Sequence, residues 1–486
     1  MMRSMYAAIS GLKNHQIRMD VIGNNIANVN TAGYKKSRVV FKDTLYQNIR
    51  GASQATGSRG GTNPMGVGLG MTLSSIDQIH TPSPATTTNK TTDMAIDGNG
   101  YFVLGCGSEE YYSRAGAFDF DKQGLLVNTS NGYQVKGWLA DKDTPDAEGN
   151  WSIDTTKSTQ AIDLSNYGSV SPKATTQMNF SGNLDSNLDV PKVGTADIDI
   201  TKTGTDTQYP TDTDNTVITS KEVYDSLGNK TTLYFRFFKT GTDPGDATAT
   251  PPVPATNTWA CDICESPNFE KMTKADGTSD YDPTTDFEVV DLSAGGVPVG
   301  GTKIIRAYNL KFDYTGSIAD STKAQITLPI DRSAAGANNM SVTLDFSQFT
   351  QFDAKSTAWA EYQDGFAKGD LTSFNVGIDG TIQGVYSNGI SKNLARVAIA
   401  NFQNPTGLLQ KGSSMFQVSN NSGDARIGAP GEEGMGTIIP GSLEMSNVDI
   451  SEEFTDMIVT QRGFQANSRI ITTSDEMLQE LVNLKR

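Results

Sequence analysis

The sequence predicts a mainly β protein with α-helical termini, in which the N- and C-terminal helices pair as a coiled coil and nested, discontinuous β domains lie between them. Apolar residues recur with the 3,4 spacing of a helix at both ends of the chain. Short runs of alternating apolar and polar residues, separated by Gly- and Asn-containing turns, fill the middle. The length of 486 residues exceeds what one hydrophobic core supports and predicts about three folding units.

The first helix is expected within residues 1–30. Its apolar stripe is interrupted by polar or small residues at Gln16 and Gly23. We expect the stripe to form an assembly interface through Met5, Ile9, Leu12, Met19, Ile22 and Ile26.

The second helix is expected within residues 446–486. Asp449, Ser451 and Glu453 supply the carboxylate and hydroxyl groups that satisfy free amides at a helix start. The expected interface residues of this helix are Phe454, Met457, Ile458, Phe464, Ile471, Leu478 and Val482, with Gln461, Ser468 and Asp475 as polar interruptions. The two stripes can be buried against each other, which would bring the chain ends together, or each can pack separately on a globular core. Mutual packing is favoured because the middle of the chain is self-sufficient as β structure.

The middle of the chain contains several turn signals and one stretch that cannot form a core. Residues 51–70 are rich in Gly, Ser and Thr and predict a flexible or ligand-ordered segment. Reversals are expected at 97–100, at 122–124 and at 227–229, each between two strands. Between residues 240 and 300 the strand pattern weakens into Pro, Thr, Asp and Gly, which predicts long loops or an inserted subdomain.

Composition argues against several classes of function. The net charge of -16, without a compensating run of Lys or Arg, repels phosphate backbones, so nucleic acid is not an expected partner. Three cysteines are too few for a disulfide framework. No secretory signal or apolar stretch of about 20 residues is present, which by itself predicts a cytoplasmic protein unless export proceeds without a cleaved signal.

Candidate catalytic and metal-binding residues are few. The only histidines are His15 and His80, which argues against a histidine triad or a His-rich metal site. Cys261 and Cys264 have the C-x-x-C spacing of a zinc or redox motif, but no second pair follows, so a local disulfide or two inert thiols is the favoured interpretation. Asp119 begins a loop that resembles a calcium site but has Ser130 where the bidentate glutamate belongs, so a hairpin turn is expected. We therefore expect no catalytic, cofactor or metal site and no small-molecule substrate, and the chain is expected not to be an enzyme.

Two long motifs resemble those of the bacterial flagellar rod and hook axial protein family. The first is DVIGNNIAN followed by Thr31 and GYK, with motif residues Asn24, Asn25, Asn28, Thr31, Gly33 and Tyr34; the second is GSLEMSNVD at 441–449 with the helix after it. AIDGNGYF at 95–102 resembles the first β domain that distal rod and hook proteins share. The long β region between about 172 and 362 fits the layout of hook subunits better than that of distal rod subunits.

The resemblance implies a structural subunit that polymerises helically into the flexible joint between the flagellar rod and filament. Partners implied by the family are further copies of the chain, the distal rod protein, the hook cap, the hook-filament junction protein and the type III export apparatus. Export by that apparatus needs no cleaved signal and implies a place in the flagellar basal body and hook, outside the cell. A distal-rod or other hook-like axial protein is the alternative, and a secreted β-sandwich adhesin is a more distant one.

The predicted division of the chain is nested. It comprises a helical domain of 1–30 and 446–486, an extended linker domain of 31–70 and 437–445, an inner β domain of 71–171 and 363–436, and an outer β domain of 172–362.

Overall fold

The computed structural model describes residues 2–54, 59–107, 109–145, 150–193, 196–197, 214–243, 256–265, 269, 287–291, 304–319, 324–330, 332, 336–432 and 434–484. The chain forms two compact units. The first comprises Met1–Gly168, Leu371–Val385 and Ser391–Arg486, and the second comprises Ser169–Asp370 and Tyr386–Ile390. The predicted mainly β class with α-helical termini is confirmed, because strands dominate both units and the long helices lie at the two chain ends.

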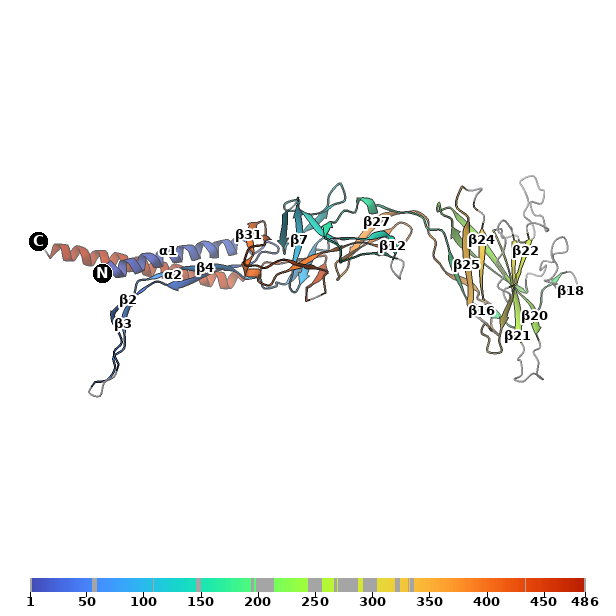
Figure 1. Cartoon of the computed structure of the whole chain (residues 1–486), viewed down its shortest axis with the longest axis horizontal. Helices are drawn as coiled ribbons and strands as arrows, with labels where there is room; N and C mark the ends of the chain where they lie inside the picture. The colour runs from blue at the N-terminus through green and yellow to red at the C-terminus, as the bar shows by residue number, and fades with distance from the viewer. Residues whose placement is uncertain are drawn as a thin grey trace. The chain divides into compact units, whose positions relative to one another are not determined.

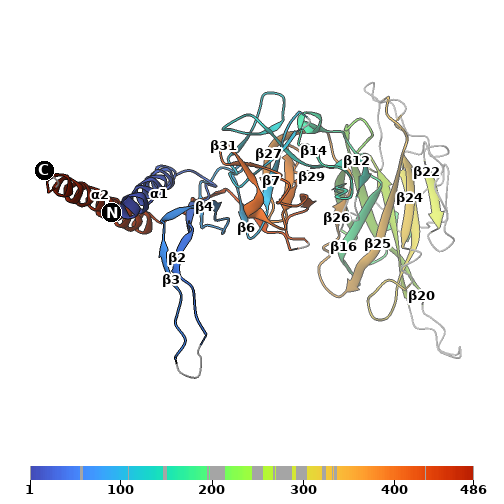
Figure 2. The ribbon, with the colours of Figure 1, turned by 60° about the vertical axis from the view of Figure 1, so that its left-hand side comes forward.

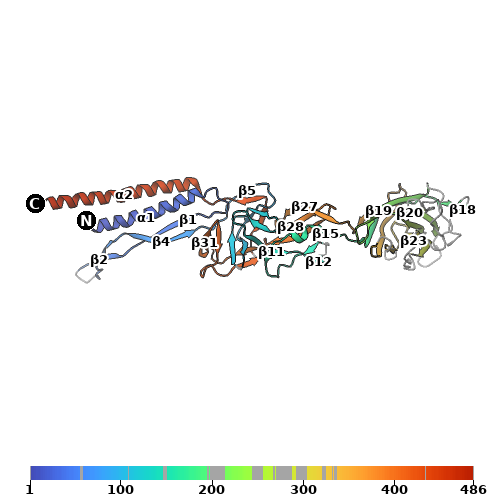
Figure 3. The same cartoon turned by 90° about the horizontal axis from the view of Figure 1, so that it is seen from above.

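The two long helices of the first unit are antiparallel neighbours, with both chain termini at one end of the pair (Figures 1 and 3). Helix α1 spans Met2–Ala27 and helix α2 spans Ile450–Asn483. The Asp449 carboxylate caps α2 by accepting hydrogen bonds from the backbone amides of Ser451 at 2.8 Å and Glu452 at 3.3 Å.

A long antiparallel ladder follows α1 and contacts it. Strand β1 (Ser37–Asp43) pairs with β4 (Met71–Gln78), and β2 (Tyr46–Arg50) pairs with β3 (Met65–Gly68). The β2–β3 hairpin projects away from the helices (Figure 2). The Gly-rich segment 51–70 therefore contains strand β3 rather than only flexible chain, because its backbone groups find ladder partners in β2.

Two short sheets join the N- and C-terminal halves of the first unit. Strand β5 (Ala85–Thr87) pairs with β35 (Ser442–Glu444), and β6 (Met94–Asp97) pairs with β34 (Thr437–Pro440). The hairpin expected around residues 97–100 is wrong, because β6 pairs with β34 whereas the next strand, β7, pairs with β8.

The main sheet of the first unit follows the strand order β28-β29-β11-β7-β8-β32-β31. Strands β9 and β10 form the hairpin expected around residues 122–124, with Phe120 opposite Leu126. Aromatic rings fill the interior, for example Phe102 and Phe118 with centroids 5.0 Å apart. The further elements of this unit are β7 (Tyr101–Cys106), β8 (Glu109–Ser113), β9 (Phe118–Phe120), β10 (Leu126–Asn128), β11 (Gln134–Leu139), β12 (Asp141–Pro145), β13 (Trp151–Ser152), β14 (Gln160–Ala161), η1 (Ser165–Tyr167), β28 (Thr381–Tyr386), β29 (Ser391–Val397), β30 (Ile399–Asn401), η6 (Pro405–Gly407), β31 (Leu409–Gly412), β32 (Met415–Gln417) and β33 (Arg426–Gly428).

The second unit contains a four-stranded sheet of order β24-β25-β16-β26 and a five-stranded sheet of order β19-β20-β21-β23-β22. The expected turn at 227–229 connects β19 to β20, which pair antiparallel. The elements of this unit are β15 (Ser169–Val170), β16 (Gln177–Asp185), β17 (Lys192–Val193), β18 (Ala196–Asp197), β19 (Thr216–Tyr224), β20 (Lys230–Asp243), β21 (Thr256–Cys264), β22 (Phe287–Asp291), β23 (Ile304–Phe312), β24 (Gln325–Ile330), β25 (Met340–Phe352) and β26 (Trp359–Gln363), while β27 (Gly369–Val376) begins here and continues in the first unit. Of the region 240–300, strands β21 and β22 belong to the five-stranded sheet, and most of the rest lies outside the described residues.

One aromatic core joins the inward faces of these two sheets. Phe180 of β16 is fully buried and lies 4.7 Å from Phe235 of β20 and 5.0 Å from Phe346 of β25, measured between ring centroids. Alternating residues of each strand point into this core, as the period of two requires.

We predict that Phe180→Ala lowers the stability of the second unit by about 3–5 kcal/mol, because it removes a ring that both sheets contact. The measurement is the denaturant dependence of hydrogen exchange in β20 and β25 of the full chain. Phe352→Ala, which removes a ring that is 52% exposed, is the matched control and is expected to change little. Equal losses in the two variants would contradict the core assignment.

Candidate assembly interface and its junction

Small residues allow the two terminal helices to approach closely. A Cβ atom added to Gly11 would lie 2.7 Å from Asn467 Nδ2, and one added to Gly463 would lie 2.9 Å from His15 Cε1. Both distances are shorter than ordinary contacts, so a larger side chain at either glycine would require the side chain of Asn467 or His15 to move. Ala8, Thr460 and Ser474 are buried along the same pair.

Polar contacts also cross the helix pair. The Arg18 guanidinium lies 2.7 Å from Asp456 Oδ2 in a partly exposed ion pair. Near the C-terminal end of α1, Asn25 Nδ2 donates a hydrogen bond to Glu453 Oε2 at 3.2 Å, and both side chains are buried. These contacts fix the antiparallel register, because a shift of one turn would leave buried polar groups unpaired.

The predicted interface residues divide into three groups in the single chain. Ile22 is buried; Met5, Leu12, Met19, Ile26, Met457, Phe464, Ile471 and Leu478 are half-buried; Ile9, Phe454, Ile458 and Val482 are exposed. Tyr6 and Val459 are also exposed. The expectation that Ile9 and Phe454 are buried between the two helices is wrong, since the closest approach involves glycine, alanine and asparagine instead.

The Asn-rich motif forms a hydrogen-bonded turn after α1. Tyr34 Oη donates to Asn25 Oδ1 at 3.2 Å and accepts from Asn24 Nδ2 at 3.3 Å. Asn28 Nδ2 donates to the Asn24 carbonyl at 2.9 Å, and Thr31 Oγ1 donates to Asn28 Oδ1 at 3.1 Å. The motif therefore ends the helix and directs the chain into β1.

Asn25 connects this turn to two other segments. Its Nδ2 donates to the Ser37 carbonyl at 2.9 Å, while its Oδ1 accepts from the Ser37 amide at 3.0 Å. With its hydrogen bond to Glu453 included, the Asn25 side chain forms hydrogen bonds to β1, to α2 and to Tyr34.

Gly33 is required by both its conformation and its surroundings. Its φ of +67° lies in the left-handed region, and an added Cβ would lie 2.5 Å from the backbone nitrogen of Ala115. Its amide donates to the Glu444 carbonyl at 2.9 Å. Gly33 therefore allows the N-terminal motif to contact both the β strands and the C-terminal motif.

A buried ion network centres on the carboxylate of Glu444. Lys35 Nζ lies 2.7 Å from Oε1, and Arg114 Nη1 lies 3.2 Å from Oε2. All three side chains are at least 98% buried. Burial lowers the pKa of the Lys35 ammonium, against the opposing effect of Glu444.

Further hydrogen bonds complete this network. Lys35 Nζ donates to the Thr81 carbonyl at 2.6 Å, and Arg114 Nη2 donates to the Gly98 carbonyl at 2.7 Å. The Ser83 amide donates to Glu444 Oε1 at 3.0 Å. The network thus pairs the three charged side chains with one another and with backbone groups where the helical and β segments of this unit meet, while Arg114 Nε is buried without a hydrogen-bond partner among the described residues.

His80 lies beside the ion network and is neutral at ordinary pH. Burial, together with the positive charges of Lys35 and Arg114, lowers the pKa of its imidazole to about 4. Its Nδ1 is 2.8 Å from Tyr101 Oη, and its ring lies 5.2 Å from that of Phe416. Burial also raises the pKa of Tyr101 to about 12.

The other candidate residues from the sequence lie apart from this junction. Cys261 and Cys264 are buried in β21 of the second unit, and no disulfide joins them; burial raises the pKa of the Cys261 thiol. Asp119 belongs to the β9–β10 hairpin, as expected. No helix in the described part of the chain is long and apolar enough to span a bilayer.

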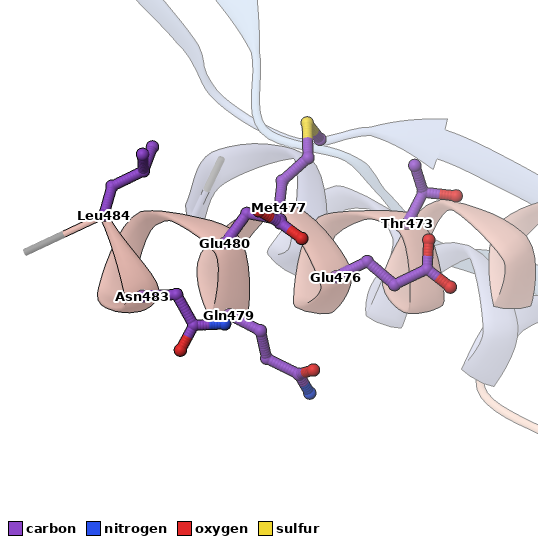
Figure 4. Close-up of a pocket in the computed structure, with 7 residues that line it drawn as sticks. All are labelled: Thr473, Glu476, Met477, Gln479, Glu480, Asn483 and Leu484. Atoms are coloured by element: carbon purple, nitrogen blue, oxygen red, sulfur yellow. The ribbon is translucent and has the colours of Figure 1, made fainter. Parts of the chain in front are cut away.

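An open groove lies along the last turns of α2 (Figure 4). Its lining comes from this helix alone: Thr473, Glu476, Met477, Gln479, Glu480, Asn483 and Leu484. These turns extend past the start of α1 (Figure 3).

Comparisons with known proteins agree with this architecture. Family models match at residues 5–35 (flagella basal body rod protein), 95–172 (flagellar hook protein FlgE/F/G D1 domain), 183–366 (flagellar basal body protein FlaE D2 domain) and 439–484 (flagellar basal body rod FlgEFG protein C-terminal). The flagellar hook protein FlgE of Borreliella burgdorferi is 40% identical over 100% of both chains. This chain belongs to the flagellar hook protein family.

Two further relatives place the chain within a wider group of axial proteins. The hook protein FlgE of Treponema pallidum is 37% identical, and the basal-body rod protein FlgG of Bacillus subtilis is 29% identical, each over 100% of both chains. The family of hook proteins is a structural one, and the resemblance found from the terminal motifs is confirmed.

Glu444→Gln in this hook-family chain is expected to destabilise the first unit by about 3–5 kcal/mol, because it leaves two cations buried without a carboxylate. Thermal and urea unfolding of the full chain measure the loss. Glu452→Gln is the matched control: its partner Lys36 is 2.8 Å away, but the carboxylate is 61% exposed, so the cost is expected to be under about 1 kcal/mol. Similar costs for both variants would refute the central role of Glu444.

Stability is also expected to depend on His80 between pH 6.5 and about 4. In the unfolded chain His80 binds a proton below its ordinary pKa of 6.5, whereas in the folded chain it stays neutral until about pH 4. Stability from this group is therefore present above pH 6.5 and falls as the pH decreases, by up to about 3 kcal/mol. Urea unfolding from pH 7 to pH 4 should show a shallower decline for His80→Gln than for the unchanged chain, and parallel curves would exclude this contribution.

Proposed function

We propose that this chain is the structural subunit of the bacterial flagellar hook, which polymerises helically into the flexible joint that transmits torque from rod to filament. The observation that carries the proposal is the apolar surface that remains exposed on the paired terminal helices. Tyr6 of α1 and Phe454, Ile458 and Val459 of α2 are large apolar residues on a surface that has no partner within the single chain.

Association of copies would remove this surface from water. Burying a side chain of the size of Ile or Phe contributes roughly 1.5–3 kcal/mol, and the effect is repeated in every subunit. We infer that the predicted residues of both helices, from Met5 to Ile26 and from Phe454 to Val482, form the interface between subunits.

An open polymer requires that the surface of one subunit contact a different surface of the next. A contact between two different surfaces is head-to-tail, and repeating it generates a helical filament unless the rotation closes into a ring. The proposed inner tube would consist of terminal helices packed as coiled coils, and the β domains would form layers outside it. The predicted nested division, with boundaries near 30, 70, 171, 362, 436 and 445, is part of this proposal.

Bending would require the outer layers to slide while the inner layer keeps its contacts. The outer face of the four-stranded sheet in the second unit suits this role, since Gln177, Asn179 and Ser181 present uncharged polar groups there. Such faces form weak and exchangeable contacts rather than ion pairs that fix one geometry.

A distal-rod or other hook-like axial protein is the alternative within the family. It is supported by the 29% identity to the rod protein FlgG of Bacillus subtilis. A rod subunit forms a straight shaft and a hook subunit forms a curved joint, so the shape of the polymer separates the two. A secreted β-sandwich adhesin would account for the second unit but not for the paired helices or their buried junction.

The chain acts without catalysing a reaction, and it leaves the cell through the flagellar type III export apparatus. Its partners are further copies of itself, the distal rod protein, the hook cap and the hook-filament junction protein. Its location is the flagellum, outside the cell.

The test is electron microscopy of a strain that lacks the gene and is complemented with Ile458→Asp. Ile458 is 58% exposed, so the variant subunit should fold, but a buried carboxylate in each subunit contact should abolish curved tubes. Ile458→Val, which keeps an apolar side chain at the same position, is the matched control and should give normal hooks. Curved tubes of normal length from Ile458→Asp would contradict the interface, and normal hooks without this gene would contradict the function.

A further inference from the structure

We propose that the β2–β3 hairpin binds a second copy of this chain, on the last turns of α2 that extend past α1. This inference rests on the proposed function, because it names a contact between successive subunits. The hairpin is described from 45 to 54 and from 59 to 69, and the binding segment of α2 is residues 477–484.

The hairpin exposes apolar side chains and has no layer packed on it. Every residue of β2 and β3 is exposed. Its large apolar side chains are Leu45, Tyr46, Ile49, Met65, Val67 and Leu69. An isolated two-stranded hairpin is at most marginally stable in water, so a surface of this composition requires a partner that covers it.

All charged side chains of the hairpin are positive. Residues 44–70 contain Arg50 and Arg59 and no Asp or Glu, in a chain whose net charge is -16. Neither arginine forms an ion pair within the described part of the chain. A partner surface that is both apolar and acidic would therefore complement it.

The end of α2 has that combination. Met477, Val482 and Leu484 are exposed apolar residues near the end of α2, which extends past the start of α1 (Figure 3). Residues 470–484 contain three carboxylates, Asp475, Glu476 and Glu480, and no Lys or Arg, although Lys485 and Arg486 follow in the sequence. Glu476, Met477 and Glu480 border the open groove, so an apolar side chain from a strand can enter between carboxylates that attract arginine.

The hairpin and the end of α2 are similar in length, and they do not cover each other within one subunit. A five-residue strand such as β2 extends about 17 Å, and an eight-residue helical segment extends about 12 Å. Both surfaces are exposed in the same subunit, and the hairpin projects away from the helix pair (Figure 2). The occupant is therefore a second copy, in a head-to-tail contact that an open polymer repeats.

Disulfide cross-linking in the polymer tests this contact. In a Cys106→Ser background, which removes the one exposed cysteine, Ile49→Cys combined with Met477→Cys should give a ladder of linked subunits after mild oxidation. The control combines Ile49→Cys with Ile450→Cys, at the opposite end of α2; Ile450 and Met477 are each 46% exposed, so accessibility is matched. A ladder from the first pair alone is expected, whereas no ladder, or equal ladders from both pairs, overturns the contact.

A charge exchange supplies an independent measurement if a cysteine variant does not assemble. Arg50→Glu should raise the critical concentration for polymerisation roughly three-fold, and adding Glu480→Arg should restore it. An unchanged critical concentration, or no restoration, overturns the inference. Polymer that forms normally without the cross-link leaves the proposed function intact, whereas the absence of any polymer from the unchanged chain overturns both.

Discussion

The junction of the first unit depends on the carboxylate of Glu444. It neutralises Lys35, which follows the N-terminal helix, and Arg114, which belongs to the β domain, although Glu444 is 409 and 330 positions from them in the sequence. A buried charge is tolerated only when its partners are in place, so the two chain ends and the β domain must assemble together. Asn25 and Gly33 add hydrogen bonds among the same segments. The result is a rigid connection between the helices and the β strands, through which force applied to one can reach the other.

The terminal helices have two different faces: an inner face where α1 and α2 contact each other, and an outer face that is exposed. The face between α1 and α2 uses Gly11, Gly463 and polar pairs such as Arg18 with Asp456. Such contacts set the register of the pair. The large apolar residues, among them Ile458 and Val459, remain on the outside. The exposed apolar face of such a helix is stabilised by packing, and in the proposed polymer neighbouring copies supply that packing.

The sequence predicted those features of the fold and the site that have a local pattern of residues, and it missed those that do not. Helical periodicity located α1 and α2 and the Asp449 cap, and alternation located the hairpins at 122–124 and 227–229. The residues at the closest approach of α1 and α2 were missed because glycine and asparagine have no hydrophobic periodicity. The available clue was the small residues, Gly11 in α1 and Thr460 and Gly463, three positions apart, in α2. The network of Lys35, Arg114 and Glu444 was missed because long-range pairing of single charges leaves no local pattern. The same reason explains the error at 97–100, where the partner of β6 is more than 300 residues away.

The unequal lengths of the helices have a structural consequence. Helix α2 has 34 residues and α1 has 26, so an antiparallel pair with Asn25 beside Glu453 leaves the end of α2 without a partner. In a closed dimer such an end would remain exposed or be paired with itself. In an open polymer each unpaired end can be covered by the next copy, and a projecting hairpin of opposite charge is a suitable cover. The overhang and the hairpin then become two halves of one axial contact, and the exposed apolar surface of each is explained by the other.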